Sequence, residues 1–146
     1  MPDRRVTPAQ RKRVAERAGM RCEYCRTSAH FAMQTFSIEH IIPRVKGGET
    51  VLENLAFACP GCNSFKHVKT EQRDAVSGKM TPLYHPRQHN WVDHFAWSEN
   101  HLQIIGLTAV GRVTVTALKL NRPGLVNLRR ALYAISEHPP KEKEAS

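Results

Sequence analysis

The sequence has 146 residues and a mass of 16.6 kDa, which suffices for one domain with a hydrophobic core but not for two ordinary ones. Apolar residues make up 40% of the chain, and no apolar run reaches the roughly 18 residues that cross a membrane, so we expect neither a membrane protein nor a secreted one. The formal net charge of +9 favours a polyanionic partner such as nucleic acid, and we predict a single domain over residues 1–146.

The positive charge is concentrated in two flanks of the chain. Residues 1–20 carry six basic and two acidic side chains, and residues 101–136 carry five basic and no acidic ones. Residues 21–100, by contrast, hold nine basic and eight acidic side chains and are nearly neutral. Each flank is therefore either a solvated helix face or a surface that contacts a polyanion.

The first predicted element along the chain is a basic helix that begins after Thr7. Thr7 and Gln10 have the spacing of a capping box, and Pro8 stands at the first helical position. Gly19 is suited to end the helix, because glycine readily adopts the left-handed conformation found after helix ends. The helix would present four basic side chains, Arg11, Lys12, Arg13 and Arg17.

All four cysteines occur in two C-x-x-C pairs, Cys22 with Cys25 and Cys59 with Cys62. Two such pairs predict a structural zinc site with four thiolate ligands, because a reducing cytoplasm, where we expect this chain to be, keeps thiols free to bind metal. Disulfides are one alternative, which a reducing compartment disfavours. A redox or zinc-storage protein is another, although a thioredoxin-like site needs only one such pair. The metal would close the long loop over residues 26–58.

The segment between the cysteine pairs predicts a strand, a loop and a second strand. Apolar residues alternate at the start of residues 36–42, and Pro43 ends this strand. A glycine-bearing loop follows over residues 44–50, and apolar residues around Asn54 anchor the second strand. The second cysteine pair then opens a short helix over about residues 60–69.

These residues resemble the HNH endonuclease family, which has the ββα-metal fold. The resemblance covers about residues 22–67 and rests on spaced elements in the family's order: Glu39-His40-Ile41-Ile42-Pro43, Gly47-Gly48, Glu53-Asn54-Leu55 and Cys59-Pro60-Gly61-Cys62-Asn63-Ser64-Phe65-Lys66. With the flanking elements, it predicts an α+β protein. A small ββα-metal core would be held together by the zinc site, with a helix on its N-terminal side and a β-hairpin plus helices on its C-terminal side.

The resemblance implies a role for each matching residue. His40 corresponds to the histidine of the first strand, the general base that activates water, and Glu39 corresponds to the acidic residue that ligates a catalytic divalent ion. Asn54 corresponds to the asparagine that braces the loop and orients the base. Adjacent residues of a regular strand face opposite ways, so Glu39 and His40 can share a site only if the strand is distorted or the ion lies at its rim.

The third motif position is Asn63, where the name-giving pattern has histidine. The resemblance to variants with asparagine implies that its side-chain oxygen ligates the ion, and an amide oxygen suits Mg²⁺ or Mn²⁺ better than zinc. His67, four residues later, is either a third ligand or an exposed histidine near phosphate. Arg44 and Lys66 are predicted phosphate contacts or, alternatively, solvated side chains.

Together these residues predict a metal-dependent HNH endonuclease that hydrolyses phosphodiester bonds of DNA, which we expect to be double-stranded. The alternative is a catalytically inactive, zinc-stabilised module that only binds nucleic acid. Both hypotheses keep the zinc site and the basic flanks. Only the endonuclease needs a second metal ion near His40.

Residues 71–138 are predicted to extend the nuclease core of residues 20–70. Glycine and prolines predict a loop over residues 71–90. A β-hairpin follows, with strands at residues 91–97 and 102–107 separated by a polar turn.

Two helices are predicted to follow the hairpin. Thr108 is a candidate cap for a helix that runs towards Leu120, although the Val-Thr-Val-Thr run within it has β propensity. Leucines at helical spacing predict a last helix from Pro123, with Arg129 and Arg130 facing solvent or DNA. The tail over residues 139–146 is expected to be disordered.

Overall fold

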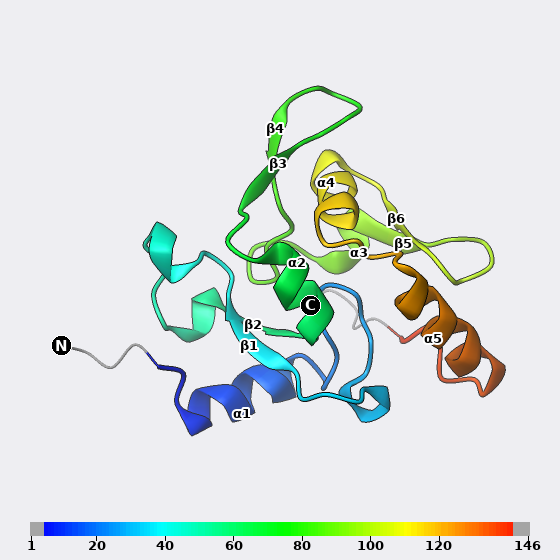
Figure 1. Cartoon of the computed structure of the whole chain (residues 1–146), viewed down its shortest axis with the longest axis horizontal. Helices are drawn as coiled ribbons and strands as arrows, with labels where there is room; N and C mark the ends of the chain where they lie inside the picture. Colours follow the sequence, from blue (N-terminus) through cyan, green and yellow to red (C-terminus); the bar gives the residue numbers. More distant parts are fainter. Residues whose placement is uncertain (1–4, 142–146) are drawn as a thin grey trace. The chain divides into compact units, whose positions relative to one another are not determined.

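The computed structural model describes residues 5–141, which form helices and three two-stranded antiparallel sheets (Figure 1). This combination of helices and small strand pairs confirms the predicted α+β class. The chain divides into two compact units: the first runs to Thr70 and includes His85–Arg87, and the second comprises Glu71–Tyr84 and the chain from Gln88 onward. None of the helices within residues 5–141 combines the length and apolarity that a membrane crossing requires.

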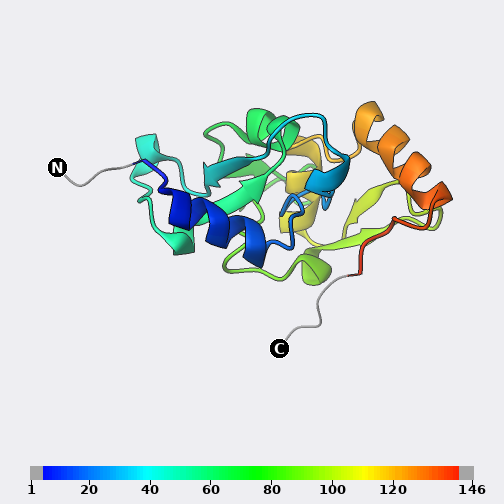
Figure 2. The same ribbon diagram turned by 90° about the horizontal axis from the view of Figure 1, so that it is seen from below.

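The first unit contains, in chain order, α1 (Pro8–Arg17), η1 (Ala29–Phe31), β1 (Ser37–His40), η2 (Arg44–Lys46), η3 (Leu52–Asn54), β2 (Leu55–Ala58) and α2 (Pro60–Lys66), where η denotes a 3-10 helix. Strands β1 and β2 pair antiparallel, with Ile38 opposite Phe57 and His40 opposite Leu55. Strand β2 is buried along its whole length, and α1 runs beside it (Figure 2). Because α2 contacts β1, this unit has the predicted strand, strand and helix arrangement.

Helix α1 begins as predicted. The Thr7 hydroxyl accepts the backbone N–H of Gln10 at 3.1 Å, and the Gln10 side chain accepts the N–H of Thr7 at 3.0 Å. Two otherwise unpaired donors of the first turn are thereby satisfied. The helix ends at Arg17, whose guanidinium donates to the carbonyls of Leu52, at 2.7 Å, and Leu55. Arg17 therefore ties α1 to the start of β2.

Helix α2 is shorter than the sequence predicted. It ends at Lys66 rather than near residue 69, because His67 adopts a positive φ of 48° that breaks the helix. The core of the first unit includes Phe36 and Phe57, whose ring centroids lie 5.1 Å apart, and the fully buried Val14 of α1. Burial of these side chains holds α1 and the strand pair together.

The second unit contains β3 (Glu71–Arg73), β4 (Met80–Pro82), α3 (Trp91–His94), β5 (Phe95–Trp97), β6 (Ile104–Gly106), α4 (Ala109–Ala117) and α5 (Pro123–Ala134). Helix α4 is its centre and contacts β3, β4 and β6. Gly111 also lets α4 lie close to the end of α3, because a Cβ there would lie 2.0 Å from the carbonyl oxygen of His94. Apolar residues from α4 and the following turn, including Val113 and Leu118, fill a core of its own.

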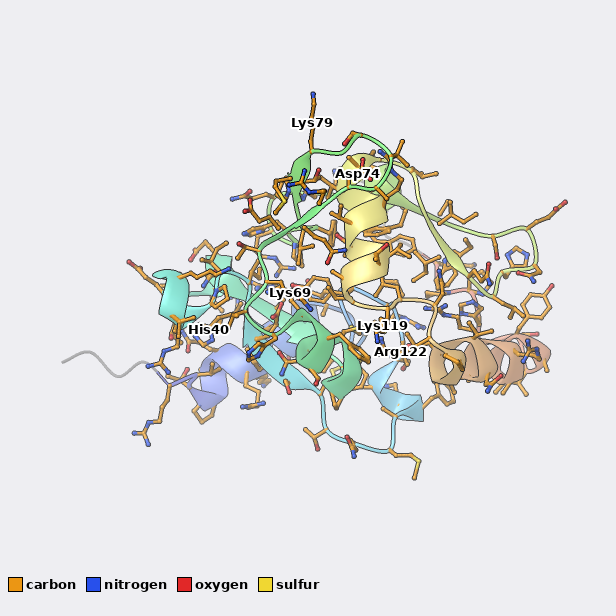
Figure 3. All side chains as sticks on the ribbon, turned by 45° about the horizontal axis from the view of Figure 1, so that its top comes forward. His40, Lys69, Asp74, Lys79, Lys119 and Arg122 are labelled. Carbon is orange, nitrogen blue, oxygen red and sulfur yellow. The ribbon has the colours of Figure 1, made fainter. Side chains whose placement is uncertain are left out.

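The loop predicted over residues 71–90 is wrong in its first part, where β3 and β4 form a hairpin. Asp74 (Figure 3) holds its turn by accepting the N–H of Ser77 at 3.0 Å, and its carboxylate pairs with Arg112 of α4 at 2.8 Å. The Arg112 guanidinium keeps the pKa of Asp74 well below its ordinary value. A side chain 38 residues away thus stabilises the turn, and no local pattern could predict that contact.

The predicted hairpin after residue 90 is confirmed only in part. Strands β5 and β6 pair, with Ala96 opposite Ile105, but residues 91–94 form the helical turn α3 instead of extending the first strand. This turn buries Trp91, whose ring packs 5.1 Å from that of Phe95. Burial of the large indole explains why local strand propensity does not decide the conformation here.

The two helices predicted after residue 107 are confirmed as α4, capped by Thr108, and α5, which begins at Pro123. The predicted exposure of Arg129 is wrong: its side chain is buried, donates to the carbonyl of Leu120 at 2.7 Å and lies 5.1 Å from the centre of the Trp97 ring. Lys119 remains exposed in the turn between the helices (Figure 3). Of the tail predicted to be disordered, residues 139–141 lack helix and strand, and residues 142–146 lie outside the described residues.

Candidate functional site

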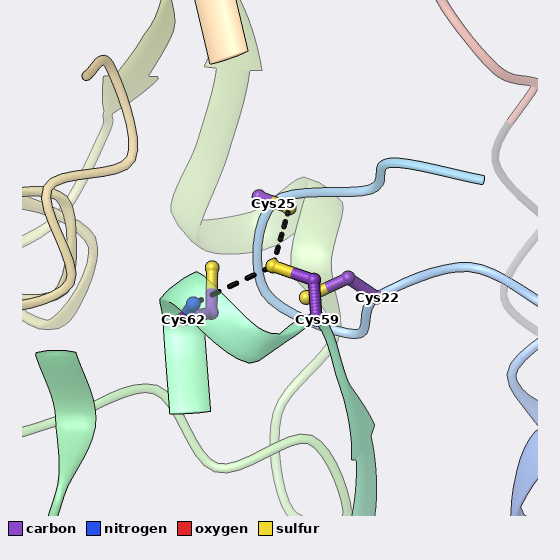
Figure 4. Close-up of side chains that lie close together, drawn as sticks. All are labelled: Cys22, Cys25, Cys59 and Cys62. Carbon is purple, nitrogen blue, oxygen red and sulfur yellow. Dashed lines mark hydrogen bonds between the residues drawn. The ribbon is translucent and has the colours of Figure 1, made fainter. Parts of the chain in front are cut away.

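The four cysteines converge in the first unit. Cys22 and Cys25 lie in the turn after α1, Cys59 caps α2, and Cys62 lies in the first turn of α2. Their Sγ atoms all lie within 4.8 Å of one another, and those of Cys25 and Cys59 are 3.7 Å apart (Figure 4). Four sulfurs bound at about 2.3 Å to a tetrahedral ion would be about 3.8 Å apart, so the cluster fits a structural metal such as zinc.

The surroundings of the cysteine thiols shift their pKa values in different directions. Burial raises the pKa of the Cys22 thiol, whereas hydrogen bonds from the other three thiols lower the pKa of Cys59 far below its ordinary value. The backbone N–H of Cys62 also donates to the Cys59 sulfur at 3.4 Å. The neighbouring thiols and this N–H therefore favour the thiolate of Cys59, which is the form that binds metal.

Asn54 closes the loop between β1 and β2. Its Oδ1 accepts the N–H of Ile42 at 2.8 Å, and its Nδ2 donates to the carbonyls of Ile42 and Glu49, both at 3.0 Å. The backbone passes so close that a Cβ at position 48 would lie 1.7 Å from the carbonyl oxygen of Ile42. Glycine at position 48 and the buried amide of Asn54 together brace this loop.

His40 is the last residue of β1 (Figure 3). Its imidazole Nε2 lies 2.8 Å from the hydroxyl oxygen of Thr50, which belongs to the braced loop. Partial burial, and to a smaller extent the positive charge of Arg44, lowers the pKa of His40 below its ordinary value. The ring is therefore neutral at neutral pH, as a proton acceptor must be.

A pocket of about 310 Å³ opens beside His40. Residues of β1, the η2 turn, α2 and the chain just after α2 line it: Ile38, Glu39, His40, Pro43, Arg44, Val45, Asn63, His67 and Val68. The structure thus brings five of the predicted site residues to one pocket. The imidazoles, the Asn63 amide and the exposed Arg44 side chain give it a polar and positively charged character.

Comparison with protein families identifies the segment that builds this pocket. Residues 22–69 match the HNH endonuclease family model. The matched segment, called the HNH region below, covers about a third of the chain and contains both cysteine pairs, the braced loop and α2. This match confirms the resemblance and indicates a nuclease function related to DNA. The search of curated proteins found no match for the chain.

Within the HNH region, other protein groups engage the Glu39 carboxylate, although Glu39 lines the same pocket as His40. Strand β1 pairs with β2 in regular register, so adjacent side chains face opposite ways. The Tyr24 hydroxyl donates to Oε1 of Glu39, and Oε2 lies 3.2 Å from Nζ of Lys66. Burial raises the pKa of Glu39, although the Lys66 charge opposes the shift. This placement differs from that of the predicted metal ligand, because protein groups engage both carboxylate oxygens.

Lys66 is buried, contrary to the predicted phosphate contact. The residue is 1% exposed, and its ammonium, besides pairing with Glu39, donates to the carbonyl of Ile41 at 2.8 Å. The ion pair therefore joins α2 to β1 inside the HNH region. Arg44, the other predicted phosphate contact, is exposed.

We expect Lys66→Met to destabilise the protein by about 3–5 kcal/mol, because it leaves the Glu39 carboxylate buried without its cation. Lys69→Met is the matched control: Lys69 is exposed and its ammonium donates to the carbonyl of Phe65, at 2.9 Å, so its loss should cost less than about 0.5 kcal/mol. Urea denaturation of the zinc-loaded proteins measures both. Equal stability of the two variants would contradict the buried ion pair.

Two contacting residues of the HNH region were not singled out from the sequence. Thr50 contacts His40 from ten residues away, and Tyr24 donates to Glu39 from within the first cysteine pair. A polar residue after two loop glycines is too common to indicate Thr50. Tyr24 is fully buried in the turn between Cys22 and Cys25, where no helix or strand periodicity predicts its burial.

Proposed function

We propose that the HNH region is a metal-dependent endonuclease that hydrolyses phosphodiester bonds of DNA, with His40 as the general base. The observation that carries this proposal is the pocket that His40, Arg44 and Asn63 line within the matched segment. Hydrolysis needs a water that loses a proton, positive charge at the phosphoryl oxygens and a bound substrate. Side chains for each of these tasks face or border this pocket.

His40 would take the proton from the attacking water. Its lowered pKa keeps the imidazole unprotonated at neutral pH, and the braced loop holds the ring through Thr50. A positioned base of this kind contributes about 10²–10⁴-fold to the rate of such a reaction.

Exposed cations would bind the DNA backbone. Arg44 and Lys46 project from the η2 turn beside the pocket, and Arg11 and Arg13 are exposed on α1 of the same unit. Such side chains bind phosphates without reading sequence, which supports a DNA substrate, and duplex DNA is the form we propose.

The residues available for a catalytic ion are Asn63 and His67, which both line the pocket. An amide oxygen and an imidazole nitrogen, completed by water, fit Mn²⁺ better than Mg²⁺, because Mg²⁺ prefers oxygen ligands and keeps a strict octahedral geometry. A bound ion would stabilise negative charge on the scissile phosphate. Glu39 could join it only by leaving Lys66 and Tyr24.

Nicking of supercoiled plasmid DNA by the zinc-loaded protein tests the proposal. We expect open-circular product with Mn²⁺, less with Mg²⁺, and none when a weak chelator removes the added ion but leaves zinc bound. Full activity without any added divalent ion would contradict the metal dependence, and absence of product with every ion would contradict the endonuclease.

We expect Arg44→Gln to move the acid limb of the kcat/KM profile to higher pH. The positive charge of Arg44 helps to lower the pKa of His40, so its removal raises that pKa and the base becomes protonated at a higher pH. Activity present at neutral pH is then lost earlier as the pH falls. Lys46→Gln, on the same turn, is the control, and an identical shift in both variants would contradict this assignment.

A catalytically inactive, zinc-stabilised module that binds nucleic acid is the second candidate. The engaged carboxylate of Glu39 favours it, because the pocket then offers an ion no free acidic ligand. This candidate predicts a mobility shift of duplex DNA that depends on salt, without nicking under any divalent ion.

A further inference from the structure

Thr50 is held in place on both sides by contacts that do not involve its hydroxyl. Its carbonyl accepts Nε2–H of Gln10, in α1, at 3.1 Å, and the carbonyl of the preceding Glu49 accepts the Asn54 amide at 3.0 Å. Gln10 also closes the capping box of α1, so the contact anchors the loop to a rigid helix end. These contacts therefore fix the backbone of Thr50 independently of the contact between its side chain and His40.

The hydroxyl of Thr50 lies 2.8 Å from Nε2 of His40. A neutral imidazole carries one N–H and one unprotonated nitrogen, and a hydroxyl can either donate or accept. If Thr50 donated to Nε2, the ring proton would be on Nδ1 and neither nitrogen would be free to accept a proton. If Nε2–H donates to Thr50, Nδ1 keeps its lone pair.

We propose that Thr50 is a positioning residue that accepts the Nε2–H of His40 and so leaves Nδ1 as the nitrogen that takes the proton from water. This inference deepens the proposed function and rests on it for its consequence for catalysis. Threonine suits the task better than serine, because its β-branch restricts rotation about χ1 and keeps the hydroxyl aimed at the ring.

Loss of the Thr50 hydroxyl would affect the proposed reaction through both the tautomer and the orientation of the His40 ring. Without the Thr50 acceptor, the neutral ring is free to place its proton on either nitrogen and to rotate about χ2. Only a fraction of molecules would then present an unprotonated nitrogen to the pocket. We expect this loss in kcat rather than in KM, because Thr50 is not among the residues that line the pocket.

The test compares Thr50→Val, which keeps the shape but removes the hydroxyl, with Thr50→Ser, which keeps it. Protein labelled with ¹⁵N-histidine reports the His40 tautomer in the zinc-loaded state without other added ions, at a pH where the ring is neutral. We expect the Nε2–H form in the parent and in Thr50→Ser, and a mixture of both tautomers in Thr50→Val. The exposed Thr35, in the same unit, supplies the control Thr35→Val.

Plasmid nicking gives the second readout. Thr50→Val should lower kcat about 10- to 100-fold, by analogy with metal-ligating histidines that lose the partner of their second ring nitrogen, with Thr50→Ser close to the parent. An unchanged tautomer in Thr50→Val, or the Nδ1–H form in the parent, would overturn the inference. If the parent protein shows no nicking at all, only the proposed function is contradicted, because the tautomer comparison still decides the role of Thr50. If Thr50→Val does not fold, Thr50→Ala repeats the comparison.

Discussion

His40→Ala is expected to reduce DNA nicking by about 10²–10⁴-fold while zinc content and thermal stability stay close to those of the parent. The imidazole is half-buried at the end of β1, and its hydrogen bond to Thr50 goes to a loop that Asn54 and Gln10 hold independently. Its removal therefore takes away the proposed proton acceptor without breaking the brace. Initial rates of plasmid nicking at saturating Mn²⁺ measure the loss.

His30→Ala is the matched control for this experiment. His30 is exposed on η1 of the same unit and does not line the pocket, so its removal should leave the nicking rate within about twofold of the parent. If His40→Ala cuts at the parental rate, His40 is not the base. If both variants lose activity together with zinc, the loss is one of folding.

Removal of zinc is expected to unfold the HNH region and to leave the second unit folded. Structural zinc contributes about 10–16 kcal/mol in small zinc-binding peptides, which is as much as the whole stability of an ordinary domain. The second unit has a core of its own. Both tryptophans of the chain, Trp91 and Trp97, belong to this unit. Far-UV circular dichroism should therefore lose amplitude on chelation while tryptophan emission stays unchanged.

Cys59→Ser gives the same test without a chelator. The variant removes one of the four clustered thiols and should release zinc, with the same loss of circular dichroism and the same tryptophan emission. Added zinc should restore the chelated parent but not the variant. An unchanged cooperative melt with less than one zinc per chain would contradict a structural role for the metal.

The sequence was sufficient for the features that depend on local spacing. The two cysteine pairs predicted a four-thiol cluster, and alternating apolar residues followed by Pro43 placed β1 within one or two residues of its bounds. The capping-box spacing predicted the start of α1 for the same reason, because all of its contacts lie within four residues.

Features set by contacts between distant residues could not be predicted. Lys66 and Glu39 both have the character of surface residues, and only the folded chain shows that they neutralise each other in the core. The hairpin of β3 and β4 likewise depends on Arg112, far along the chain, and the burial of Arg129 depends on Leu120 and Trp97. In each case one tertiary contact overrides the local preference for solvent or loop.

Cys62 and Asn63 are consecutive residues of one seven-residue helix, so the thiolate cluster and the pocket share α2. A peroxide that converts the cysteines to disulfides would release the metal and, with it, the helix turn that presents the amide to the pocket. The proposed cleavage should therefore stop under oxidising conditions and resume once a reductant and zinc are supplied, although no residue proposed to contact the phosphate is itself oxidised.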